Sequence, residues 1–167
     1  ETWVTTSRNP LSRLYSREAF RLLEGNFEPA LRAPDEVEPL AALQLGAWMA
    51  GVAIENSMLG AAHACANPLT ARYGIIHGVA IAALLPHAVR WNLAVAAGSY
   101  RELALELPVR LDQLAAAGGL ANRLGDLGVQ RSDLVELAQD AAAQWTGRFN
   151  PRPFNAEGAL EIYQWAF

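Results

Sequence analysis

The sequence has a single cysteine, Cys65, so it can form no internal disulfide and no metal site built from cysteines. Basic residues are also scarce. The 13 Lys+Arg are scattered without a basic block, and the formal net charge is -4. This balance argues against nucleic acid as a partner and against bulk attraction to anionic lipid. A chain without disulfides fits a reducing compartment, and we therefore expect a cytoplasmic protein.

Long uncharged apolar runs are missing as well. Between Leu40 and Ala71 the only charged residue is Glu55, but glycine, asparagine and proline interrupt the stretch. No uncharged run reaches the roughly 18–20 residues that a membrane-spanning helix needs. The polar start of the chain lacks the apolar core of a signal peptide. We interpret Leu40–Ile54 as a helix buried at the centre of the protein, in preference to a membrane helix, and expect no membrane partner.

Strand signals are absent, since no stretch alternates convincingly between apolar and polar residues and no Asn-Gly or Asp-Gly hairpin occurs. Helical periodicity dominates instead, without an internal repeat or a linker, which predicts a single all-α domain. We expect Gly25-Asn26 to interrupt or end the first helix, Asp35 and Asn155 to cap later helices, and Gly74 to end one. The expected helices cover residues 10–23, 35–54, 60–73, 77–92, 99–107, 109–117, 132–145 and 155–167.

The three histidines are the candidate functional residues, because other known functional motifs are absent. The sequence has no Gly-x-Gly-x-x-Gly after a strand, no Walker loop and no Gly-x-Ser-x-Gly. His63 lies on an otherwise small and apolar helix surface, where a neutral imidazole needs a hydrogen-bond partner or a metal. His77 falls at a helix start, where the positive end of the helix dipole favours the neutral ring that a metal requires.

A structural role for these histidines stays open. A histidine in an alanine-rich helix is more often a hydrogen-bonded core residue than a ligand. Two imidazoles also fall short of the about three protein ligands of a catalytic zinc or iron site. If His63 and His77 bind a metal across the turn at Gly74, further ligands must come from outside this chain. Cys65 falls on another helix face than His63, and we expect a buried structural thiol there.

A longer pattern surrounds the two histidines. It consists of a glycine, a histidine, a polar residue four positions later followed by Pro-Leu, a His-Gly ten residues beyond, and a closing Leu-Pro-His-x-x-x-x-Asn. In order and spacing it resembles the signature of the iron-containing alcohol dehydrogenase family. Three further segments also resemble that family, so that the resemblance extends over the whole chain. The four segments are GAAHACANPLTARYGIIHGVAIAALLPHAVRWN, ETWVTTSRNPLSRLYSREAFRLL, RLGDLGVQRSDL and NPRPFNAEGALEIYQWAF.

The resemblance implies a fold and a set of partners. In this family an N-terminal Rossmann-like half binds NAD(P), the C-terminal half is all helical, and the active site lies between them. Residues 1–167 would then be one metal- and substrate-binding domain of the dehydroquinate synthase-like fold, with the Rossmann-like half absent. The start of the chain reads like the middle of a helix, which suggests a missing upstream segment. The expected partners are that dinucleotide-binding half, a small alcohol or aldehyde substrate, and further copies in a homo-oligomer.

The resemblance also implies site residues. His63 and His77 match the family's two C-terminal metal ligands, which hold Fe²⁺ or sometimes Zn²⁺. The other two ligands, an Asp and a His, would lie a few residues upstream of Glu1. Asn67 stands where many members have a His that helps in proton transfer; an amide can hydrogen-bond there but cannot titrate near neutrality. His87 matches a histidine that is not a ligand, and we interpret it as structural.

We therefore expect a metal-dependent, NAD(P)-linked alcohol dehydrogenase that, when intact, oxidises an alcohol to an aldehyde or ketone by hydride transfer. The isolated chain is expected to be inactive. Two alternatives stay open. One is a stand-alone, non-catalytic helical module for oligomerisation or regulation. The other is a polyol (glycerol-type) dehydrogenase or a dehydroquinate synthase-like relative, although the Leu-Pro-His and Asn-Pro-Arg-Pro segments favour the alcohol dehydrogenase branch.

Overall fold

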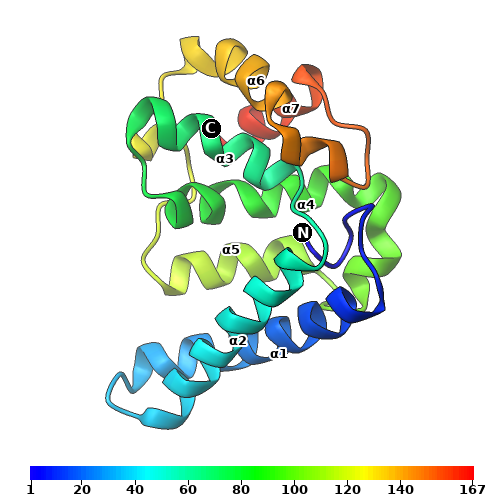
Figure 1. Ribbon diagram of the computed structural model, residues 1–167. Coiled ribbons are helices and arrows are strands. Elements are labelled where there is room, and N and C mark those ends of the chain that lie inside the picture. Colours follow the sequence, from blue (N-terminus) through cyan, green and yellow to red (C-terminus); the bar gives the residue numbers. More distant parts are fainter.

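The computed structural model describes residues 1–167 and consists of helices and turns, without a strand (Figure 1). The all-α fold predicted from the sequence is thus confirmed. Three short 3-10 helices, η1 (Gly125–Leu127), η2 (Arg131–Asp133) and η3 (Trp145–Phe149), lie in the connections of the C-terminal part. The α-helices are α1 (Pro10–Arg32), α2 (Val37–Glu55), α3 (Ala61–Tyr73), α4 (His77–Arg101), α5 (Leu107–Ala117), α6 (Leu134–Ala143) and α7 (Ala156–Ala166).

Helix α4 runs through the middle of the molecule, with α3 on one side of it and α5 on the other (Figure 1). The main core joins α3, α4, α6 and α7 and is rich in alanine, which lets these helices approach closely. A smaller core packs the N-terminal segment, through Trp3 and Val4, against the second half of α4. Helix α4 therefore positions both the start of the chain and the helices that follow it.

Gly158 in α7 marks a close approach to α4. A Cβ atom at residue 158 would lie 2.4 Å from Cζ2 of Trp91. The indole cannot easily yield, because its N–H donates to Glu161 at 2.6 Å and the guanidinium of Arg152 lies 3.8 Å from the ring centroid. The absence of a side chain at residue 158 is thus what allows α4 and α7 to pack.

We expect Gly158→Ala to lower the free energy of unfolding by about 1–3 kcal/mol, because overpacking outweighs the better helix propensity of alanine. Urea denaturation of the purified chain measures the effect. Gly98→Ala is the matched control, since a Cβ at this position of α4 meets no atom within 4 Å. It should stabilise by up to about 1 kcal/mol. Equal changes in the two variants would contradict the packing argument.

Helices α1 and α2 form a hairpin that projects beyond the other helices (Figure 1). Helix α2 packs mainly on α1 and buries only Gly46 and Ala53. Trp48 is 59% exposed and Val37 is 74% exposed. The prediction of a central, buried helix at Leu40–Ile54 is therefore wrong: the helix exists, but within this chain nothing covers its outer faces.

Two helices, α2 and α4, are long and apolar enough to cross a membrane by length and composition, although we expected no such run. In α4, half of the 18-residue stretch that is apolar enough to cross a membrane is buried inside the protein. In α2, only 11% of the corresponding stretch is buried. A core helix of a globular protein passes the same test, as α4 does here. Length and composition alone therefore assign neither helix to a membrane.

Several predicted helix ends are confirmed. Asn155 caps α7 by accepting the N–H of Gly158 at 3.0 Å, and Gly74 ends α3 with a left-handed φ of 65°. Others are wrong. Helix α1 continues through Gly25-Asn26 to Arg32, α2 has no side-chain cap from Asp35, and α4 extends to Arg101 in place of a separate helix at 99–107.

A candidate metal centre at the start of two helices

The first turn of α3 is capped by side chains from distant parts of the chain. The N–H of Ala61 donates to Oδ1 of Asn150 at 3.2 Å, and the N–H of Ala62 donates to Oε1 of Glu1 at 2.7 Å. Gly60 makes room for both acceptors, because a Cβ there would lie 2.9 Å from Asn150 Oδ1 and 3.1 Å from Glu1 Oε1. The amide oxygen of Asn150 and the carboxylate oxygen of Glu1 thus accept hydrogen bonds from N–H groups that a helix start leaves without partners.

The other carboxylate oxygen of Glu1 contacts Nδ1 of His63. Burial raises the pKa of the Glu1 carboxyl, but the hydrogen bond with His63, the charges of the N-terminal amino group and of a protonated His63, and the N–H of Ala62 together outweigh burial, so the pKa lies below the ordinary value. An ionised carboxylate only accepts, so Nδ1 of His63 carries a proton, and in the neutral ring Nε2 keeps a free lone pair. A carboxylate behind a histidine in this way fixes the ring and its tautomer for metal binding through the other nitrogen.

The second imidazole comes from the start of the next helix. His63 is the third residue of α3 and His77 is the first of α4, and the turn at Gly74 folds the two helices back on each other. The centroids of the two rings lie 5.3 Å apart, with an angle of 50° between the ring planes. His77 is exposed, and the side chain of His63 is 23% exposed. The structure therefore brings the two rings together at the surface of the domain.

This spacing suits two imidazoles on one ion. A histidine nitrogen lies about 2.1 Å from a bound zinc ion, which places the ring centroid roughly 3.2 Å from it. Two rings at a tetrahedral angle would have centroids about 5.2 Å apart, close to the observed 5.3 Å. No place in the chain gathers three or more His, Cys, Asp or Glu side chains that could hold a metal ion. The two rings can therefore supply only part of a coordination sphere.

Asn67 lies one helical turn after His63, on the same side of α3. Its amide donates to Oε1 of Gln144 at 3.0 Å, and both residues line a hollow of about 660 Å³ between α3 and α6. No hydrogen bond joins Asn67 to either ring. The structure thus places Asn67 near His63 in the helix but holds its side chain against the segment that follows α6.

The other two candidates are not part of the pair. His87 contacts Arg90, with 3.3 Å between Nδ1 and Nη1, and both burial and Arg90 lower the pKa of His87. Cys65 is fully buried, and burial raises the pKa of its thiol. A buried, protonated thiol is unreactive, so the prediction of a buried structural cysteine is confirmed.

Two residues of this arrangement were not predicted to act in it. The resemblance gave Glu1 only a position after the absent ligands, and it gave Asn150 no role. The contact of Glu1 with His63 spans 62 residues, and that of Asn150 with Ala61 spans 89. No local pattern signals contacts across such separations, and only the folded chain reveals them.

Two neighbouring imidazoles, one of them paired with a largely buried carboxylate, match the way in which a metal-ligating histidine donates its other N–H to a carboxylate. Residues 1–167 match the family described as "Fe-containing alcohol dehydrogenase family, C-terminal". The chain is 29% identical to the 1,3-propanediol dehydrogenase of Citrobacter freundii, over 100% of this chain and 47% of that protein. It is 32% identical to the lactaldehyde reductase of Escherichia coli strain K12, over 75% of this chain and 37% of that protein.

Solved structures of similar proteins support the same family. The alcohol dehydrogenase from Oenococcus oeni superposes with a TM-score of 0.94 at 25% identity, covering 100% of this chain and 48% of that one. A 1,3-propanediol oxidoreductase gives a TM-score of 0.92 at 27% identity, with the same coverage. The chain therefore belongs to the iron-containing alcohol dehydrogenase family. It spans about half the length of the relatives that match it end to end.

Proposed function

We propose that residues 1–167 are the metal- and substrate-binding domain of an NAD(P)-linked alcohol dehydrogenase, and form the C-terminal half of a two-domain enzyme. Family membership over the whole chain supports the reaction class. The 5.3 Å approach of His63 and His77 is the observation that supports the site. We propose Fe²⁺ or Zn²⁺ as the metal. The names of the relatives, a propanediol dehydrogenase and a lactaldehyde reductase, favour a small alcohol or aldehyde as substrate.

The chain's own residues would prepare this site. Glu1 keeps the proton of His63 on Nδ1, so that Nε2 is the atom that binds. A metal ion held by His63 and His77 would polarise an alcohol oxygen, and NAD(P) bound by the other half would accept the hydride from the carbon. Asn67 would orient the substrate by hydrogen bonding, and because an amide does not titrate near neutrality, it would not carry the proton.

The remaining ligands and the dinucleotide site would come from a partner half. Relatives that match the chain end to end are about twice as long, which supports a second half that supplies these groups. We propose that an N-terminal dinucleotide-binding half packs at this site, that the intact enzyme is a homo-oligomer, and that it works in the cytoplasm.

The isolated chain tests this division of the site. We expect the purified 167-residue chain, supplied with Fe²⁺, NAD⁺ or NADP⁺ and 1,3-propanediol, to show no turnover, because it holds two converging histidines and no dinucleotide loop. The proposed two-domain enzyme should form NAD(P)H, and a chelator should abolish that activity. NAD(P)H absorbance measures both. Turnover by the chain alone would contradict the two-half site, and a gene that starts at Glu1 would favour the non-catalytic module.

A further inference from the structure

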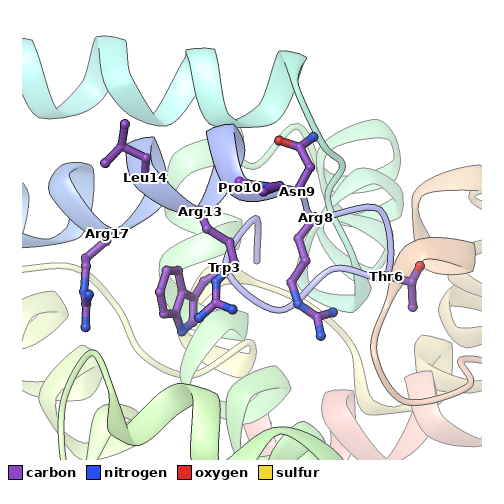
Figure 2. A pocket seen from close by; sticks show the side chains of 8 residues that line it. All are labelled: Trp3, Thr6, Arg8, Asn9, Pro10, Arg13, Leu14 and Arg17. Carbon is purple, nitrogen blue, oxygen red and sulfur yellow. The ribbon is translucent and has the colours of Figure 1, made fainter.

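A second feature lies where the N-terminal segment enters α1, within the stretch from Trp3 to Arg17. A hollow of about 670 Å³ opens there, and Figure 2 shows the eight residues that line it. Three of them, Arg8, Arg13 and Arg17, are arginines, and none is acidic. The chain as a whole carries a net charge of -4, so this cluster is not a by-product of a generally basic surface.

The three arginine side chains lie at the surface, and contacts with Trp3 and with the backbone orient them. Trp3 is 5% exposed and its indole N–H donates to the carbonyl of Ser99 at 2.7 Å, which makes the ring a fixed platform. The guanidinium of Arg13 lies 4.3 Å from the ring centroid, and that of Arg17 lies 5.7 Å from it. Arg8 donates to the carbonyl of Thr5 at 2.9 Å. In Figure 2 the three guanidinium groups extend toward the same side of the hollow.

Little in the chain neutralises this charge. Glu102 is the one carboxylate within ion-pair distance, 3.4 Å from Arg13, and the side chains of both are more than 40% exposed. Arg8 and Arg17 make no ion pair. Arg13 and Arg17 are also four residues apart on α1, a spacing at which like charges destabilise a helix. The first turn of α1 has no acidic residue, so the positive end of the helix dipole adds to the same potential.

We propose that this hollow binds a compact phosphate anion with two or more negative charges, such as the pyrophosphate group of a phosphorylated small molecule. Guanidinium groups match phosphate oxygens in both charge and geometry. Trp3 is 5% exposed and Arg13 lies over its ring, so the indole offers no open face on which a base could stack, and recognition rests on the phosphate. The site is independent of the proposed dehydrogenase chemistry, because it uses neither His63 nor His77.

Isothermal titration calorimetry of the 167-residue chain with inorganic pyrophosphate, at constant ionic strength, tests the site. We expect saturable one-to-one binding that Arg17→Gln and Arg8→Gln each weaken about tenfold, the loss of one charge-assisted contact. Arg32→Gln is the matched control, an exposed arginine at the other end of α1, and should leave the affinity unchanged. Without ligand, Arg17→Gln should keep or raise the melting temperature, because it removes the repulsion from Arg13.

Three results would overturn the proposal. The first is a titration with pyrophosphate that releases or absorbs no more heat than a titration with chloride at equal ionic strength. The second is equal weakening in Arg32→Gln, which would show general screening of charge. The third is binding of a poly-glutamate peptide without binding of pyrophosphate, which would assign the hollow to an acidic protein partner. None of these results bears on the metal site, so failure here is distinct from failure of the proposed function.

Discussion

In the proposed two-domain enzyme, His63→Ala and His77→Ala should each remove the proposed metal and, with it, the dehydrogenase activity. Each change would delete one of the two metal ligands that we propose this domain contributes. Loss of a residue that merely supports a ligand weakens metal binding by about 10–100-fold, and loss of a ligand itself should exceed that. Metal content of the purified variants and their kcat/KM measure the two effects.

His87→Ala is the matched control for this experiment. It removes the same side chain from α4, but His87 contacts Arg90 and not the other two rings. We expect it to keep both metal and activity. Full metal content and activity in either the His63 or the His77 variant would defeat the assignment of the pair. Equal loss in all three would point to general damage to the fold rather than to a lost ligand.

Glu1→Gln should weaken metal binding by about 10–100-fold, which is the usual effect of losing a carboxylate behind a ligating histidine. The amide oxygen of glutamine can still accept the N–H of Ala62. It lacks the charge that holds the proton of His63 on Nδ1, and its NH₂ group can favour the opposite tautomer. The metal dissociation constant measures the first effect, and nitrogen NMR of the His63 ring measures the second.

A purely structural role for Glu1 would give a different result. In that case Glu1→Gln would lower the melting temperature and leave the tautomer of His63 unchanged. Glu18→Gln is a suitable control, because Glu18 pairs with Arg21 in an exposed, local contact on α1. Unchanged metal affinity and an unchanged tautomer in Glu1→Gln would remove Glu1 from the site.

The parts of the fold that could be predicted are those with local causes. Asn155 caps α7 because its side chain reaches an amide three residues ahead, and Gly74 ends α3 because glycine readily adopts a positive φ. Helix α2 shows the limit of such reasoning. Its sequence is apolar on every side, which predicts burial, but burial depends on which neighbours are present. Here α1 alone covers it.

The candidate site also has parts that could be predicted from the sequence and parts that could not. The resemblance singled out His63 and His77, and the turn at Gly74 explains why their rings meet. It did not indicate that Glu1 contacts His63 or that Asn150 caps α3. Each of these contacts joins segments more than 60 residues apart, and such pairs are set by the packing of α3 against the N-terminal segment and the loop that contains Asn150.

That packing has a consequence for the kinetics of metal exchange. A helix terminus normally frays by itself, at little cost in free energy. The opening turn of α3 cannot do so without also displacing the Glu1 segment or the loop that contains Asn150. Departure of an ion from His63 would then require concerted movement of segments that are remote in sequence. The residence time of the ion would follow the cooperativity of the whole domain rather than the mobility of one helix end.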